Sequence, residues 1–168
     1  MNRKMYDRSV AVFRHNLGVL DRLLTLAEAN AAARGFEADK LLAGRLAPDM
    51  FPLTRQIQIA CDLAKAASAR LAGIEVPQHA DDETSFAELR ARIAKVQSFI
   101  DSVDADAVNA GEARAITLKI QGQELNFVGA DFLDSWALPN FYFHFITAYN
   151  LLRMQGVPLG KRDFLGRA

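Results

Sequence analysis

The sequence of 168 residues contains a single cysteine, Cys61. One cysteine cannot form an intramolecular disulfide, and this scarcity favours a reducing, cytoplasmic location. The chain also lacks an excess of charge, because twenty lysine and arginine residues balance twenty aspartate and glutamate residues. No stripe of basic residues alternates with aromatic ones, so we expect no binding of nucleic acid.

No uninterrupted apolar run approaches the roughly 20 residues that a membrane-spanning helix needs. Residues 1–8 carry charges, and no continuous apolar segment of the signal-peptide type follows them. The ten glycines are scattered and form no phosphate-binding loop. The serines stand outside the Gly-x-Ser-x-Gly context that is typical of serine hydrolases. We therefore expect no membrane association, no nucleotide-binding loop and no serine nucleophile.

The chain does have enough apolar residues for one substantial core. Apolar residues make up 51% of the sequence and charged residues 24%, which is typical of a globular domain. A chain of this length buries roughly 70% of the surface that its unfolded form exposes, so it needs no disulfide or metal for stability. The simplest organisation is a single domain that covers residues 1–168.

Four long segments repeat apolar residues at steps of three and four, which is typical of helices with one buried face. Ser85 and Glu88 form the pattern of a capping box at the start of the third segment. Pro139 opens the fourth, because proline is well tolerated in the first turn of a helix. The expected helices cover about 8–34, 52–73, 85–103 and 139–155.

The period changes between the third and fourth helices. Apolar and polar residues alternate over 116–121, and Gly122 offers a turn. This pattern predicts a β-hairpin with strands near 115–120 and 124–128. A hairpin alone is marginally stable, so we expect it to pack on the helices or to pair with a partner chain.

These elements predict an all-α fold, an up-down four-helix bundle with a small β-hairpin before the last long helix. Four antiparallel helices with short to medium connections are the simplest way to bury four apolar stripes. Residues 157–168 contain two glycines and a proline and are expected to form an extended C-terminal segment.

The segment 138–153 holds the densest aromatic run and the only histidine inside an apolar helical pattern, His144. A histidine that faces the interior could bind a metal through one ring nitrogen or exchange a proton near neutral pH. The alternative is a histidine that is hydrogen-bonded to another helix and packed among aromatic rings. His15 and His79 fall outside the apolar stripes, and we expect both to be solvated.

A polar cluster is expected around His144 if the second and fourth helices start at the same end of the bundle. Buried polar groups must be hydrogen-bonded, so the cluster is either a structural network or the floor of a small-molecule pocket. Aromatic residues near it would supply the walls of such a pocket, or would form plain core packing. The pocket candidates are His144, Asn140, Asp49, Gln56, Tyr149 and Trp136.

The fourth helix is apolar on nearly all sides. Phe141, Phe145 and Tyr149 follow one helical stripe, whereas Tyr142 and Phe143 point to other sides. Such a helix is either central or covered by a partner. This pattern predicts a homodimer.

Four segments carry the markers of a known family: residues 48–52 with Gln56, residues 139–144, residues 151–158 and residues 160–166. They resemble the DinB-like four-helix-bundle superfamily, and most closely an uncharacterised bacterial family within it. The resemblance covers nearly the whole chain, but its motifs are family markers rather than catalytic signatures.

The resemblance carries an implication about metal binding. Many DinB-like proteins hold a divalent metal with three histidines, one from the second helix and two from a His-x-x-x-His pair on the fourth. The resemblance places the second histidine of that pair on His144 and the first on Asn140, and the second helix has no histidine. We therefore expect no metal or other cofactor. Asp49 and Gln56 could add oxygen ligands, but such ligands suit harder ions than zinc.

Three hypotheses for the function are open at this point. The first is a DinB-like bundle that lacks the three-histidine metal site and has a small-molecule pocket. The second is a metal-dependent enzyme that uses His144, for which the DinB-like relatives suggest thiol transfer. The third is a structural or partner-binding homodimer.

Overall fold

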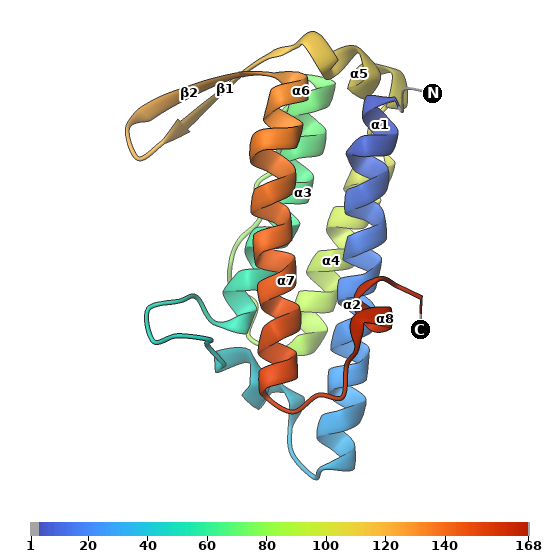
Figure 1. Ribbon diagram of the computed structural model, residues 1–168, viewed down its shortest axis with the longest axis vertical. Helices are drawn as coiled ribbons and strands as arrows, with labels where there is room; N and C mark the ends of the chain where they lie inside the picture. Colours follow the sequence, from blue (N-terminus) through green and yellow to red (C-terminus); the bar gives the residue numbers. More distant parts are fainter. Residues whose placement is uncertain (1–3, 168) are drawn as a thin grey trace.

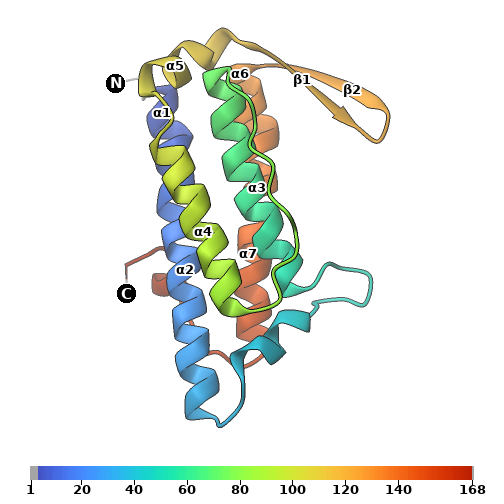
Figure 2. The ribbon, with the colours of Figure 1, turned by 180° about the vertical axis from the view of Figure 1, so that it is seen from behind.

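The computed structural model describes residues 4–167. Four helices of 16 to 24 residues lie side by side along the long axis of the molecule (Figures 1 and 2). They are α2 (Val10–Ala33), α3 (Leu53–Ala72), α4 (Phe86–Asp101) and α7 (Leu138–Met154). The predicted predominance of helix is confirmed.

Shorter elements connect and flank these helices. They are α1 (Met5–Arg8), the 3-10 helices η1 (Ala38–Ala43) and η2 (Ala110–Ala113), α5 (Ala105–Asn109), α6 (Gly129–Asp131), the π-helix η3 (Phe132–Ala137) and α8 (Lys161–Phe164). Strands β1 (Ala115–Ile120) and β2 (Gln123–Val128) form the predicted antiparallel hairpin, which projects from one end of the molecule (Figure 1). Because α6, η3 and α7 follow one another directly, the backbone is helical from 129 to 154.

The helices α3 and α4 run in the same direction, which differs from the up-down order expected from the sequence. At the start of α4, the backbone N–H of Phe86 donates to Asp39 Oδ1 in η1, the element that precedes α3. At the other end lies Arg114, which follows α5 and η2 in the chain. Its Nε donates to the carbonyl oxygen of Leu71 near the end of α3. An apolar stripe is the same in either direction, so the helical period could not distinguish the two arrangements.

The parallel arrangement requires a long connection, residues 74–85, which we call the strap. It leaves the end of α3 and returns along the molecule to the start of α4 (Figure 2). Extended chain of this length reaches about 40 Å. The 20-residue helix α3 is about 30 Å long, so the strap can span it without strain.

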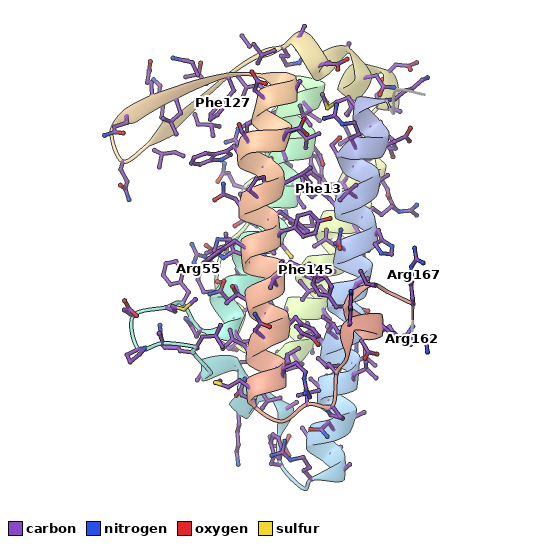
Figure 3. The ribbon with its side chains drawn as sticks, viewed as in Figure 1. Phe13, Arg55, Phe127, Phe145, Arg162 and Arg167 are labelled. Atoms are coloured by element: carbon purple, nitrogen blue, oxygen red, sulfur yellow. The ribbon has the colours of Figure 1, made fainter. Side chains whose placement is uncertain are left out.

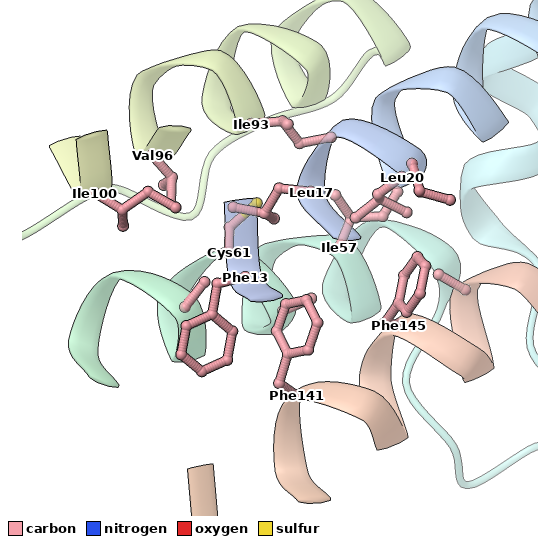
Figure 4. Packing of buried hydrophobic residues seen from close by; sticks show 14 of the residues in the cluster. Phe13, Leu17, Leu20, Ile57, Cys61, Ile93, Val96, Ile100, Phe141 and Phe145 are labelled. Atoms are coloured by element: carbon pink, nitrogen blue, oxygen red, sulfur yellow. The ribbon is translucent and has the colours of Figure 1, made fainter. Parts of the chain in front are cut away.

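The core lies where the apolar faces of the four long helices meet (Figure 4). The rings of Phe13 and Phe141 meet edge to face with centroids 5.1 Å apart, and Phe141 stacks on Phe145 at 5.9 Å. Burying one such side chain stabilises the fold by roughly 2–3 kcal/mol. Cys61 is fully buried in the same core, and this burial raises the pKa of its thiol to about 12. Cys61 is therefore protonated and unreactive at neutral pH.

The predicted capping box at the start of α4 is confirmed. The backbone N–H of Glu88 donates to Ser85 Oγ at 3.2 Å, and the backbone N–H of Ser85 donates to Glu88 Oε2 at 3.1 Å. At the end of α3, Gly73 adopts a φ of 73°, a left-handed conformation that glycine accepts without steric cost. Gly73 and Ser85 therefore fix where the strap begins and ends.

The hairpin packs one apolar face on the helical segment that leads into α7. Ile116 lies opposite Phe127 in the register and is 5% exposed. The Phe127 ring lies 5.9 Å from the rings of Phe132 and Trp136 (Phe127 is labelled in Figure 3). These contacts supply the apolar support that a two-stranded sheet needs.

A buried guanidinium fastens the strap to α3 and α4, and we call this group of charges the Arg92 cluster. The Arg92 side chain is 2% exposed, and its Nη1 donates to Glu83 Oε1 at 2.9 Å. Its Nη2 lies 2.9 Å from Asp62 Oδ1 and 2.9 Å from Asp81 Oδ1. Lys65 Nζ is also paired with Asp62, at 2.7 Å. Residues of α3, the strap and α4 therefore share one cation.

Replacing Arg92 with methionine should lower the free energy of unfolding by about 2–3 kcal/mol, because Glu83, which is 11% exposed, loses its cation, while the partly exposed Asp62 and Asp81 keep only Lys65 and Arg55. Arg90→Met is the matched control on the same helix, since Arg90 is 37% exposed and pairs with Asp21 and Glu28. That control should cost less than about 1 kcal/mol. Urea denaturation of the three proteins measures the difference, and equal losses for the two variants would contradict the role of the Arg92 cluster.

Candidate functional site

His144 of α7 is joined to α3 by one short hydrogen bond. Its Nδ1 lies 2.7 Å from Oε1 of Gln56, whose side chain is buried. The other end of the same amide is also engaged, because Gln56 Nε2 donates to the carbonyl oxygen of Phe51 at 3.1 Å. A carbonyl oxygen can only accept, so the amide must present its nitrogen to Phe51 and its oxygen to His144.

This arrangement fixes the proton on the imidazole ring. Because Gln56 Oε1 is an acceptor, His144 must carry hydrogen on Nδ1 and donate it. Burial lowers the pKa of His144, and the positive charge of Arg55 lowers it further. At neutral pH the ring is therefore uncharged, and Nε2 holds a lone pair that can accept a hydrogen bond or bind a metal.

A pocket of about 220 Å³ opens beside this pair. Two phenylalanine rings form part of its wall, and the ring of Phe143 meets that of His144 edge to face at 5.1 Å. Phe51 and Phe143 are 53% and 57% exposed. The pocket is lined by Asp49, Met50, Phe51, Gln56, Phe143 and His144.

Arg55 connects the pocket to the Arg92 cluster. Its Nη1 donates to Asp81 of the strap and to Gln58 Oε1, the latter at 3.2 Å. Gln58 Nε2 donates in turn to Glu83 at 2.9 Å. Figure 3 places Arg55 on the flank of the molecule beside the loop that precedes α3. The charge that lowers the pKa of His144 is thus held in position by the strap.

The structure brings together three of the six pocket residues expected from the sequence, Asp49, Gln56 and His144. The other three, Asn140, Trp136 and Tyr149, line none of this pocket. Asn140 Nδ2 donates to the carbonyl oxygen of Trp136 at 2.7 Å, one turn back on the same helix.

The separation follows from helix direction. The expected cluster required α3 and α7 to start at one end, but α7 starts where α3 ends (Figure 1). The Trp136 ring packs on Phe127 of the hairpin, and the Tyr149 ring meets Phe164 of α8 at 5.5 Å. The aromatic lining that the structure does supply, Phe51 and Phe143, could have been found from two signals. Phe51 lies in the marker segment 48–52, and Phe143 lies off the core stripe of its helix.

The other two histidines also line surface hollows. His15 of α2 borders one of about 470 Å³ that also includes Asn16 and Tyr142. His79 of the strap borders one of about 280 Å³ next to Arg92. Neither ring has a side-chain hydrogen bond to another described residue that would fix its tautomer, as Gln56 does for His144.

The donor set around His144 does not match a three-histidine metal centre. Among residues 4–167, no group of three or more histidine, cysteine, aspartate or glutamate side chains is placed to hold a metal ion. His144 and Asp49 are the two side chains of those types in the pocket lining. Within the same residues, no helix is both long and apolar enough to cross a membrane.

Comparison with known proteins places these observations in a family. A family model described as a domain of unknown function, DUF1993, matches residues 5–165. The chain is also similar to a solved structure, the crystal structure of a DinB family member protein from Shewanella denitrificans at 1.83 Å resolution. The two sequences are 43% identical over 96% of this chain and 91% of that chain, with a TM-score of 0.87. No curated protein matches. The resemblance to DinB-like proteins inferred from the sequence is confirmed.

The tautomer of His144 can be measured directly. Nitrogen NMR of the wild-type protein at pH 8 should show the proton on Nδ1. In Gln56→Glu, a carboxylate replaces the amide oxygen, so the pKa of His144 should rise above its wild-type value. In Gln56→Met, which removes the acceptor without adding charge, the preference for Nδ1–H should be lost.

The lowered pKa of His144 also predicts the direction in which the stability of the protein changes with pH. Protonation opposes folding here, so the contribution of His144 to the free energy of unfolding should be complete above about pH 6.5 and should decline as the pH falls below that value.

For the tautomer measurement, a wild-type ring that carries its proton on Nε2 would contradict the assigned geometry.

Proposed function

The chain belongs to the DUF1993 family, a domain of unknown function, and from that premise we propose that it binds a small molecule in the pocket beside His144. The observation that supports this proposal is the orientation of one imidazole. Gln56 holds Nδ1, and Nε2 has no hydrogen-bond partner among residues 4–167. A fixed ring with a free acceptor beside an open pocket is suited to orienting a ligand.

A purely structural histidine is less well supported by these contacts. The buried polar atoms of a side chain that only stabilises a core are normally bonded to protein groups or to ordered water. His144 satisfies one nitrogen and keeps the other available next to about 220 Å³ of space. The exposed rings of Phe51 and Phe143 add apolar surface at the same place.

The proposed function does not use a three-histidine metal site. Asn140 stands where the DinB-like pattern has the first histidine of its pair, and its amide is committed to the carbonyl oxygen of Trp136. The helix α3 contains no histidine. We further propose a cytoplasmic location, in keeping with a single buried cysteine.

A screen of small hydrogen-bond donors by NMR tests the pocket. Alcohols, amides and amines should shift the signals of His144 and Phe143 in a saturable way. Binding should weaken about fivefold to tenfold in His144→Phe, which keeps an aromatic ring but removes the acceptor. His15→Phe is the matched control, because His15 lies beside a different hollow, and it should bind like the wild type.

Two outcomes would contradict this function. The first is the absence of any saturable shift at His144. The second is a stoichiometric metal in protein purified without a polyhistidine tag, measured by elemental analysis and lost in His144→Ala. The second result would favour a metal-dependent enzyme instead.

A second candidate, a homodimer, is supported by exposed apolar side chains on α7 and in the pocket lining. Phe143 and Ile146 stand three residues apart on α7 and are therefore neighbours on its surface. They are 57% and 41% exposed, and Phe51, which lines the pocket together with Phe143, is 53% exposed. A second copy of the chain would cover these side chains.

Light scattering at micromolar concentration tests the dimer. The wild type should have twice the mass of one chain, and Phe143→Ser should shift it to the mass of one chain. Ile74→Ser is the control, because Ile74 is 47% exposed but follows the far end of α3, and it should leave the mass unchanged. A wild-type protein that is monomeric under these conditions would exclude this candidate.

A further inference from the structure

We propose that the ligand of the His144 pocket is an organic ammonium, a protonated amine attached to a small apolar or aromatic group. This inference rests on the proposed function, because it names the chemical class of ligand for the same pocket. It follows from the polar atoms, the charge and the aromatic surface that the pocket presents.

The side chains of the pocket present hydrogen-bond acceptors. Both ends of the Gln56 amide are engaged, with His144 at the oxygen and the carbonyl of Phe51 at the nitrogen. The one N–H of the neutral His144 ring is used on Gln56, which leaves the lone pair of Nε2. Asp49 adds a carboxylate, which accepts only. A ligand must therefore bring the donor.

The charge of the pocket lining is negative. Asp49 is its only charged side chain, and it has no ion-pair partner among residues 4–167. Two nearby arginines are committed elsewhere. Arg45 Nη1 donates to the carbonyl oxygen of Met50, and Arg55 is paired with Asp81. Neither arginine lines the pocket, so the lining itself carries one negative charge, and the positive charge of Arg55 that also acts on His144 is already paired with Asp81.

The remaining surface suits a cation with an apolar body. Phe51 and Phe143 expose about half of their surface, and the face of an aromatic ring attracts an ammonium group. Met50 adds an unbranched, adaptable side chain. The volume of about 220 Å³ corresponds to about seven water-sized groups, enough for one ring with a short aminoalkyl arm.

A metal cation fits the same negative charge less well. Asp49 and His144 supply two donors, and metal centres in proteins usually need at least three. No such group of three exists among the described residues. An ammonium needs no coordination sphere, because its N–H groups pair individually with the carboxylate and with Nε2.

Three ligands with one shared ring test the class of ligand. Benzylamine, benzyl alcohol and benzoate differ in charge and donor capacity but have similar size, and their dissociation constants can be measured by NMR titration at pH 7.5. We expect benzylamine to bind about tenfold more tightly than benzyl alcohol, and benzoate to bind more weakly than either. In Asp49→Asn, the advantage of benzylamine over benzyl alcohol should fall to about twofold or less.

A fourth ligand isolates the hydrogen bond to His144. Benzyltrimethylammonium keeps the charge and the ring but has no N–H, so it should bind the wild type more weakly than benzylamine does. In His144→Phe the difference between these two cations should disappear. Equal affinity of the two cations for the wild type would overturn the role assigned to Nε2.

The outcomes separate the class of ligand from the function itself. If none of the four ligands, and no other donor, shifts His144, the proposed pocket function fails. If benzyl alcohol or benzoate binds as tightly as benzylamine, the pocket stands and the ammonium class is overturned. Stoichiometric Zn²⁺ or Mg²⁺ that displaces benzylamine and requires both Asp49 and His144 would also overturn it, in favour of a metal.

Discussion

A guanidinium that is almost fully buried must be paired, because an isolated charge away from water is far too costly to keep. Arg92 meets this requirement with carboxylates from α3 and from the strap. The pairing explains how the chain can place α3 and α4 in parallel. A connection that runs the length of a helix has little apolar surface of its own, and the Arg92 cluster supplies a fixed anchor for it. The parallel direction of α3 and α4 and the position of the charges in the Arg92 cluster therefore constrain each other.

That constraint extends to the pocket through Arg55. The residue lies next to Gln56 on α3 and is bonded to Asp81, a member of the Arg92 cluster. Gln56 sets the tautomer of His144, while Arg55 helps to keep the ring neutral. The chemistry of one imidazole thus depends on two successive residues of α3, one acting by a hydrogen bond and the other by its charge. Positioning of this kind makes a ring nitrogen a reliable acceptor.

The sequence predicted the local elements well and their arrangement less well. The helical period, the Ser85 capping box and the alternation near Gly122 each depend on neighbouring residues, so they can be read without tertiary information. Helix direction depends on where the strap is fastened, and the charges that fasten it look like an ordinary polar loop in the sequence. The same error placed Asn140 beside the start of α3, whereas in the structure α7 starts where α3 ends and Asn140 lines none of the pocket. His144 was found because it is a polar residue within an apolar pattern, which is a local signal, and Gln56 because it accompanies the marker segment 48–52 near the start of the second helix.

The complete burial of Cys61 links the chemical reactivity of its thiol to the unfolding of the protein. It is the only thiol in the chain, it has no exposed surface, and its pKa of about 12 keeps it protonated. An alkylating reagent can reach it only when the helices around it separate, because the thiolate form and solvent access are both required for reaction. The rate of alkylation therefore reports the opening of the whole core rather than the fraying of a loop or a terminus. The native thiol of Cys61 is therefore a built-in probe of global unfolding, and no label has to be introduced.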